Sequence, residues 1–169
     1  VSSEVLKGTT LFLTPTLEKL GHAEDPATEA PEATDAQSDA PAPNALHHAR
    51  VLLVEDDPVN REVLRELLLE EGASVVLADD GLVALELARA GSYDLVLMDM
   101  RMPHLDGPSA TRAIRQLPGW ADIPIVALTA NAFVEDRQHC LDAGMDEFLT
   151  KPVNPDMFVA TLVRLLSAK

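Results

Sequence analysis

The chain has 169 residues, 47% of them hydrophobic, which suffices for one ordinary globular domain with an appendage. Its formal charge of −15 argues against a nucleic-acid-binding surface, because phosphate contacts require clustered Lys and Arg. The single cysteine, Cys140, excludes an internal disulfide and a cysteine-rich zinc motif, and no apolar run approaches the roughly 20 residues that span a bilayer. We therefore expect a cytoplasmic protein with no membrane segment in this chain.

The first 20 residues contain one short run of strand-forming residues, which is too short to fold alone. Gly8-Thr9-Thr10 leads into this run. The segment resembles the closing β-hairpin of histidine-kinase ATP-binding domains, in which a Gly-x-Gly-Thr stretch precedes the final strand, although Leu6 replaces the usual first glycine. The resemblance implies that residues 1–20 are the tail of a kinase domain whose catalytic parts are absent. The alternative is an unstructured terminus.

Residues 21–49 are expected to form a flexible acidic linker. From Gly21 to Ala45 the sequence is dominated by Ala, Pro, Glu, Asp and Thr, and it contains no Val, Ile, Leu or aromatic residue. Such a segment cannot bury enough apolar surface to offset the entropy lost on ordering. The folded domain is therefore predicted to span residues 50–169.

Two short apolar runs in this domain end on carboxylates. Val51–Val54 is followed by Glu55 and Asp56, and Leu95–Met98 is followed by Asp99. Runs of this length indicate strands buried on both faces, as in a parallel sheet. Ligands of open α/β sheets bind beyond the carboxyl ends of the strands, so Asp99 is the predicted centre of a site. The alternative for Asp99 taken alone is a turn residue.

Strand and helix patterns alternate along the whole domain, and Pro58 is suited to the first turn of a helix. The expected strands are 51–54, 74–78, 93–99, 123–128 and 147–150, and the expected helices are 59–71, 81–90, 109–117, 134–143 and a last one from Asn154 or Pro155. Five βα units with short connections predict an α/β fold, a doubly wound five-stranded parallel sheet of (βα)5 type, similar to flavodoxin. No glycine-rich phosphate loop follows the first strand, which argues against a dinucleotide or flavin site.

The residues at the strand ends suggest a metal-assisted phosphoryl chemistry. Glu55, Asp56 and Asp99 would crowd negative charge into one pocket, which is costly unless a cation neutralises it. Ligand sets made only of oxygen suit Mg²⁺ or Mn²⁺. Asp99 could form an aspartyl-phosphate as the nucleophile, with Lys151 pairing with the phosphoryl oxygens and the Thr129 hydroxyl donating to another. Alternatively, Lys151 is a plain surface lysine, and Thr129 is the N-cap of a helix.

Several stretches together resemble the receiver domain of two-component signalling. They are Val51–Arg61, Leu97–Pro103, Asp106-Gly107, Leu128–Ala130, Ala143–Asp146 and Lys151-Pro152. The Val-Glu-Asp-x-Pro-Val-Asn-Arg form is most similar to receivers fused to hybrid histidine kinases. The resemblance covers residues 50–168 and implies the C-terminal receiver of a hybrid sensor histidine kinase, without a complete kinase domain in this chain.

The resemblance also implies roles for individual residues. Asp99 would accept phosphate from a histidine, and the divalent ion would be held by Asp99, Glu55, Asp56 and the backbone carbonyl of Arg101. Asp57 matches a position that is commonly Asn, and it is not expected to be a ligand.

A second set of implied roles concerns the response to phosphate. Thr129 and Phe148 match the switch pair, in which the hydroxyl moves toward the phosphate and the aromatic ring turns inward. Arg101 and Asn131 are expected to influence the lifetime of the phosphate, because they flank the path of the attacking water. The Lys151-Pro152 peptide resembles a family site that is cis.

The expected function is a phosphorylation-controlled receiver in a phosphorelay, with self-phosphotransfer, slow autodephosphorylation and a changed surface as output. The expected partners are a histidine kinase domain and a histidine phosphotransfer protein, and the chain is expected to be a monomer, cytoplasmic even if it belongs to a larger membrane-anchored kinase. One alternative is a receiver-like module that binds its partner regardless of phosphate. Another, a flavin-binding protein, is disfavoured by the acidic pocket.

Overall fold

The computed structural model of the chain describes residues 44–130 and 134–168. The predicted kinase-like tail over residues 1–20, most of the predicted linker and Asn131 lie outside the described residues. In the part of the chain that the structure describes, no helix has both the length and the apolar character needed to cross a membrane.

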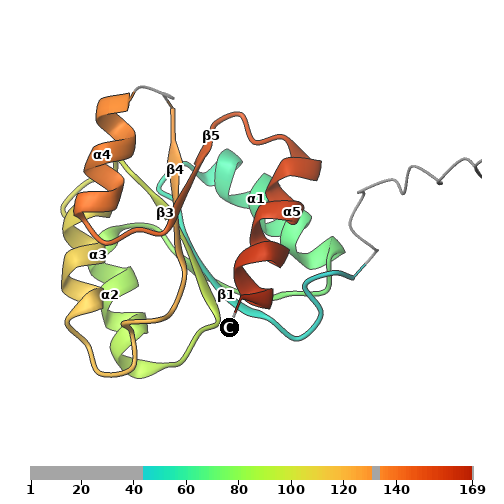
Figure 1. The fold of residues 1–169 in the computed structure, drawn as a ribbon, viewed down its shortest axis with the longest axis horizontal. Coiled ribbons are helices and arrows are strands. Elements are labelled where there is room, and N and C mark those ends of the chain that lie inside the picture. The colour runs from blue at the N-terminus through green and yellow to red at the C-terminus, as the bar shows by residue number, and fades with distance from the viewer. Residues whose placement is uncertain (1–43, 131–133, 169) are drawn as a thin grey trace, which may run out of the picture. The chain divides into compact units, whose positions relative to one another are not determined.

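Five parallel strands alternate with five helices over the described residues, which confirms the predicted α/β fold (Figure 1). The strands are β1 Arg50–Val54, β2 Ser74–Ala78, β3 Leu95–Asp99, β4 Ile125–Thr129 and β5 Glu147–Thr150. The helices are α1 Pro58–Glu70, α2 Gly81–Ala90, α3 Gly107–Arg115, α4 Val134–Asp142 and α5 Pro155–Ser167. The strand order is β2-β1-β3-β4-β5, so β1 and β3, which carry the acidic ends, are neighbours at the middle of the sheet.

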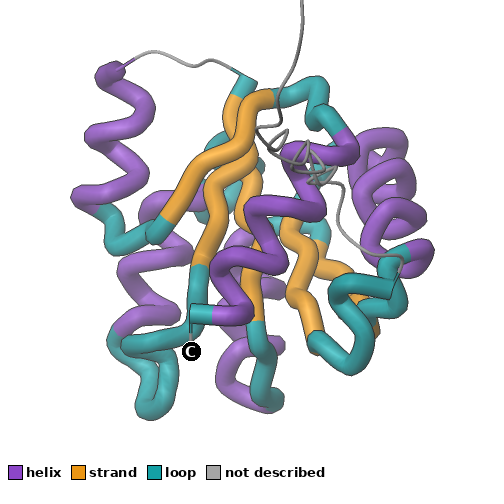
Figure 2. Tube along the Cα trace, turned by 45° about the vertical axis from the view of Figure 1, so that its right-hand side comes forward, coloured by secondary structure: helices purple, strands orange, loops and turns teal. Residues whose placement is uncertain are grey.

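The helices form two layers, with α2, α3 and α4 on one face of the sheet and α1 and α5 on the other (Figures 1 and 2). Successive side chains of β3 point to opposite faces of the sheet, so they belong alternately to two hydrophobic clusters. Val96 and Met98 pack in the cluster beneath α2, α3 and α4, whereas Leu95 and Leu97 pack in the cluster beneath α1 and α5. All four side chains are 0% exposed, which explains why β3 is apolar at every position rather than at alternate ones.

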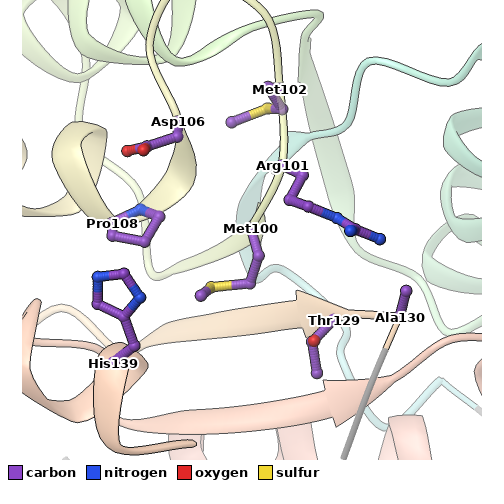
Figure 3. Close-up of a pocket in the computed structure, with 8 residues that line it drawn as sticks. All are labelled: Met100, Arg101, Met102, Asp106, Pro108, Thr129, Ala130 and His139. Carbon is purple, nitrogen blue, oxygen red and sulfur yellow. The ribbon is translucent and has the colours of Figure 1, made fainter. Parts of the chain in front are cut away.

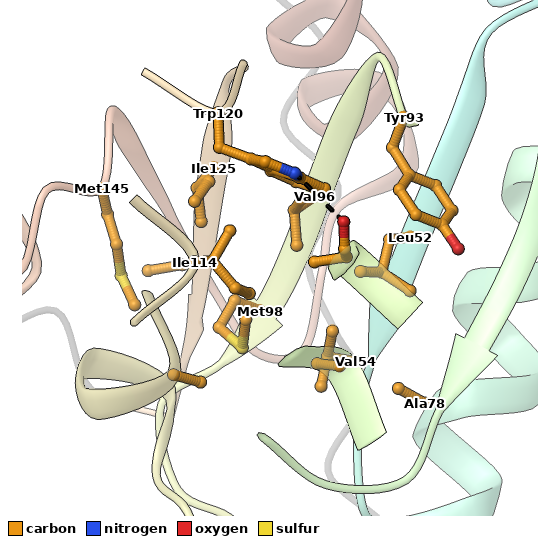
Figure 4. Close-up of a cluster of buried hydrophobic side chains, with 14 of the residues drawn as sticks. Leu52, Val54, Ala78, Tyr93, Val96, Met98, Ile114, Trp120, Ile125 and Met145 are labelled. Carbon is orange, nitrogen blue, oxygen red and sulfur yellow. Dashed lines mark hydrogen bonds between the residues drawn. The ribbon is translucent and has the colours of Figure 1, made fainter. Parts of the chain in front are cut away.

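Trp120 closes the end of the first cluster that lies farthest from the strand carboxyl ends (Figure 4). Its indole Nε1 donates to the carbonyl of Ala88 at 3.1 Å, and its ring centroid lies 6.0 Å from that of Tyr93. The indole is thus buried with its polar group satisfied.

Helix α3 begins at Gly107, before the predicted start at Ser109. Asp106 is the N-cap, and its carboxylate accepts a hydrogen bond from the backbone N–H of Ser109 at 2.8 Å. Pro108 lies in the first turn of the helix, where proline is favourable. The boundaries of β3 and β4 also shift, and β4 includes Thr129 as its last residue.

Residues 44–49 differ from the flexible linker expected there. The Leu46 side chain is 1% exposed and packs in the cluster beneath α1 and α5. The backbone N–H groups of Ala45 and Leu46 donate to the carboxylate and the carbonyl of Glu71, at 3.1 and 3.0 Å. The packed part of the domain therefore starts earlier than the predicted boundary at Arg50. Leu46 is the only Val, Ile or Leu between residues 21 and 50. This single apolar side chain was the feature of the sequence that could have indicated the earlier start of the domain.

Candidate functional site

The predicted carboxylates meet at the carboxyl ends of the two central strands. Glu55 follows β1 directly, and Asp99 is the last residue of β3. Glu55, Asp56 and Asp99 each offer a carboxylate oxygen, and these oxygens all lie within 4.8 Å of one another. Asp56 is exposed, whereas the other two are buried. The carboxylates line a cavity of about 230 Å³ that Lys151 and Arg101 also border.

Lys151 joins this cluster from the loop after β5. Its ammonium Nζ lies 2.7 Å from Glu55 Oε2, 2.8 Å from Glu55 Oε1 and 2.9 Å from Asp99 Oδ2. The side chain of Lys151 is 18% exposed. One ammonium therefore contacts two buried carboxylates directly, with Asp56 as a third acid beside them. With all four groups ionised, the cluster holds an excess of negative charge.

The pKa values of the buried pair follow from this imbalance. Burial and then the charge of Asp99 raise the pKa of Glu55, and they outweigh the hydrogen bonds from Lys151 and Asn60 that lower it. Burial is the largest single influence on the pKa of Lys151 and lowers it, but the hydrogen bonds and charges of Glu55 and Asp99 together raise it. Lys151 is therefore held firmly as a cation, while an additional positive charge would favour the ionised form of Glu55.

The donor atoms suit a hard divalent cation. Glu55 Oε2 is buried, and within the described part of the chain its one close polar contact is the 2.7 Å ion pair with Lys151 Nζ. It therefore keeps an unused acceptor lone pair. The candidate ligands are all oxygens, and Mg²⁺ is bound through one or two carboxylates with waters completing its octahedron. The residues present thus fit a Mg²⁺ ion.

The loop between β3 and α3 folds back closely onto Asp99. The N–H of Arg101 donates to Asp99 Oδ1 at 3.3 Å, and the N–H of Gly107 donates to the carbonyl of Met100 at 3.3 Å. A Cβ atom on Gly107 would overlap the carbonyl oxygen of Asp99. Glycine at this position therefore allows the first residue of α3 to contact the backbone of Asp99. The predicted carbonyl ligand, that of Arg101, belongs to this same loop.

Thr129 lies at the end of β4, beside the same site, and is 5% exposed. Its carbonyl accepts a hydrogen bond from the backbone N–H of Lys151 at 2.7 Å, which ties the loop after β5 to β4. Because α4 begins only at Val134, Thr129 is not the N-cap of that helix. The Lys151–Pro152 peptide is cis.

A larger cavity of about 340 Å³ lies between Thr129, the β3–α3 loop and helix α4. Figure 3 shows Met100 extending from the end of β3 toward Pro108 and His139, with Thr129 at the other end of the cavity. Phe148, the other member of the predicted switch pair, is half-buried on β5 and packs against the cluster beneath α2, α3 and α4.

Some contacts of the site could not be found by reasoning from the sequence. Asp57 is the N-cap of α1, where its carboxylate accepts from the N–H groups of Val59 and Asn60 at 2.9 Å. That role was signalled by Pro58 in the next position. The amide of Asn60 also donates to Glu55 Oε1 at 3.3 Å, and Arg61 donates to the Glu55 carbonyl at 2.9 Å. Both positions were noted in the sequence, but their contacts with Glu55 were not predicted.

Comparisons with known proteins agree with this geometry. The family described as the response regulator receiver domain matches residues 51–163. Sensor histidine kinase RcsC of Escherichia coli K12 is 38% identical over 140 residues, which cover 83% of this chain and 14% of that protein. Sensor histidine kinase GacS of Pseudomonas protegens is 43% identical over 108 residues, which cover 62% of this chain and 12% of that protein. The chain therefore spans a small part of the length of these relatives.

Solved structures give the same match. The receiver domain of sensor histidine kinase PA1611 from Pseudomonas aeruginosa PAO1 has 44% sequence identity and a TM-score of 0.68, covering 71% of this chain and 98% of that chain. That structure holds a magnesium ion coordinated in its active site cleft. Chemotaxis protein CheY4 of Vibrio cholerae has 31% identity and a TM-score of 0.67, covering 70% of this chain and 98% of that chain.

Proposed function

Because the chain belongs to the response regulator receiver domain family, we propose that Asp99 accepts a phosphoryl group from a phosphohistidine in a Mg²⁺-dependent reaction. The observation that carries this proposal is the contact of Lys151 with Glu55 and Asp99 at strand ends far apart in the sequence. The match to receivers of sensor histidine kinases supports a place for the chain in a phosphorelay.

In the proposed reaction, an oxygen of Asp99 attacks the phosphorus atom, the P–N bond to the histidine breaks, and its electron pair stays on the imidazole nitrogen. Glu55, Asp56, Asp99 and the carbonyl of Arg101 would hold Mg²⁺, or Mn²⁺ in its place. When bound, the ion supplies charge neutralisation at the phosphoryl oxygens. The Lys151 ammonium pairs with a phosphoryl oxygen as a point charge. Water attack on the same phosphorus reverses the modification slowly.

The proposed response to phosphate involves Thr129 and Phe148. The hydroxyl of Thr129 donates to a phosphoryl oxygen, and the ring of Phe148 turns inward on the same face of the sheet. The proximity of Thr129 to Asp99 supports this role, because β3 and β4 pair with Asp99 opposite Leu128. Arg101 and Asn131 are proposed to set the lifetime of the aspartyl-phosphate.

The proposed partners are a histidine kinase domain and a histidine phosphotransfer protein, which recognise the chain as a monomer in the cytoplasm. Within a hybrid sensor kinase, the chain would be the C-terminal receiver. The alternative is a receiver-like module that binds its partner without phosphate, and the complete set of acidic and basic residues at the strand ends weighs against it.

The proposal is tested with acetyl phosphate as the phosphodonor and intact mass as the readout, with Mg²⁺ and with EDTA. We expect a gain of one phosphoryl group that requires the metal ion and is absent in Asp99→Asn. Asp122→Asn is the matched control, because Asp122 is an exposed aspartate in the α3–β4 loop, and it should be labelled normally. Labelling of Asp99→Asn at the wild-type stoichiometry would refute the assignment. A folded wild-type chain that gains no phosphate under any condition would favour the phosphate-independent module.

Gly107→Ala tests whether the close approach of the first residue of α3 to the backbone of Asp99 positions this aspartate. The added methyl group overlaps the Asp99 carbonyl, so the backbone there must shift. We expect the free energy of unfolding to fall by about 1–3 kcal/mol and the labelling rate to fall as well. Gly91→Ala is the control, because its Cβ would meet Tyr93 at an ordinary 3.4 Å; its stability should change by less than about 0.5 kcal/mol. Equal behaviour of the two variants would show that the close approach has no role.

A further inference from the structure

The ring of Phe148 lies close to two elements of the domain, strand β4 and helix α4. Phe148 belongs to β5, one of the two edge strands of the sheet, and pairs with Ala127 on β4. Thr129 is two residues beyond Ala127, so strand alternation places the side chains of Phe148 and Thr129 on the same face of the sheet. The ring therefore lies one pleat repeat away from the Thr129 end of the 340 Å³ cavity.

The ring of Phe148 contacts a cation from helix α4. The guanidinium carbon of Arg137 lies over the Phe148 ring, 5.5 Å from its centroid. A guanidinium at this distance from an aromatic face is attracted by the negative potential of the ring. Arg137 is exposed and Phe148 is half-buried, so a ring that turned farther into the protein would leave this guanidinium, and we call the present orientation outward.

We propose that Arg137 is a positioning residue that holds Phe148 in its outward orientation and thereby opposes the activated state of the receiver. This role rests on the proposed function, in which the ring turns inward when Asp99 is phosphorylated. A contact made in only one of two states shifts the equilibrium by its own strength, which for an exposed cation–π pair corresponds to a two- to fivefold change in population. The cavity beside Thr129 gives the ring a place to move, and the Arg137 contact sets how readily it moves.

The test measures binding of beryllofluoride, a phosphoryl mimic, in the presence of Mg²⁺. Arg137→Ala should bind it two- to fivefold more tightly, because the outward state has lost its stabilising contact. Arg137→Lys keeps a cation and should shift the affinity less. Arg89→Ala, which removes an exposed arginine from the last turn of α2, should bind like the wild type and controls for net charge.

A double-mutant cycle with Phe148→Leu separates the ring contact from a general charge effect. Leucine has no aromatic face, so adding Arg137→Ala to Phe148→Leu should leave the affinity unchanged. The NMR signals of the Phe148 ring provide a second readout: in Arg137→Ala, before beryllofluoride is added, they should shift toward their positions in the beryllofluoride-bound wild type. A role limited to stability would move neither measurement.

Two results would overturn this role. One is an unchanged affinity in Arg137→Ala while the wild type binds the mimic, which would leave the proposed phosphotransfer intact. The other is the same gain in affinity with Phe148 or Leu at position 148. If the folded wild type did not bind beryllofluoride with Mg²⁺ at all, the proposed function itself would fail, and the role of Arg137 with it.

Discussion

Replacing Lys151 by Met is expected to reduce the initial rate of phosphorylation by acetyl phosphate by about 10²–10³-fold. The ammonium is the cation that contacts both Glu55 and Asp99, at 2.7 and 2.9 Å. Its loss removes the charge that pairs with the phosphoryl oxygens. It also leaves Glu55, which is 0% exposed, without its ion partner, so we expect the metal-free protein to lose about 3–5 kcal/mol of unfolding free energy. Intact mass over time and urea unfolding measure the two effects.

A second substitution separates the two effects of losing Lys151. Lys151→Met leaves the buried carboxylate of Glu55 without its cation. Adding Glu55→Gln removes that unpaired charge, so the double variant should regain stability while its labelling stays low. Arg164→Met is the matched control, because its 2.6 Å ion pair joins an exposed arginine to the partly exposed Glu147 and should contribute less than about 1 kcal/mol. Labelling of Lys151→Met at the wild-type rate would remove this lysine from the proposed mechanism.

The second large expected effect concerns stability alone. Arg115 donates hydrogen bonds to the carbonyls of Trp120 and Ile123 at 2.6 Å and of Gly144 at 2.8 Å, and to the carboxylate of Asp146 at 2.7 Å. Arg115→Ala leaves these acceptors without their charged donor, so we expect a loss of about 3–5 kcal/mol in urea unfolding. Under native conditions the final stoichiometry of phosphorylation should be unchanged, because these bonds lie at the opposite end of the sheet from Asp99.

Arg112→Ala is the matched control for this variant. Arg112 is on the same helix but is exposed, and its removal should cost less than about 1 kcal/mol. Arg115→Lys should recover little, because a single ammonium cannot reach acceptors in two loops as the guanidinium does. An Arg115→Ala variant as stable as Arg112→Ala would contradict this account of how the two loops are joined.

The residues of the site differ in how far the sequence predicted them. Glu55, Asp56 and Asp99 were predicted together because each follows a buried apolar run, and the carboxyl ends of parallel strands meet at one edge of a sheet. The structure brings these side chains together with Lys151, while their catalytic and metal-binding roles stay predictions. Asp57 was recognised as an unusual acid, but its N-cap bonds were not predicted.

The contacts between distant segments could not be predicted in the same way. Lys151 and Glu55 are 96 positions apart, and nothing in their spacing gives a distance. The same holds for the bonds from Arg115 to Gly144 and Asp146, and for the contact between Arg137 and Phe148. Leu46 was assigned to the linker because composition averages over a segment, whereas burial depends on where one side chain packs.

The sequence by itself determined the elements of this protein, their alternation, the parallel sheet and the acidic strand ends. Each of these follows from periodicity, turn chemistry and the geometry of parallel strands, all of which act over a few residues. Only the tertiary structure decided which side chains meet: the ion pairs of Lys151, the loop contacts of Arg115, the close approach of Gly107 to Asp99 and the ring contact of Arg137. These depend on strand register and on the packing of helices against the sheet, which many distant residues fix together.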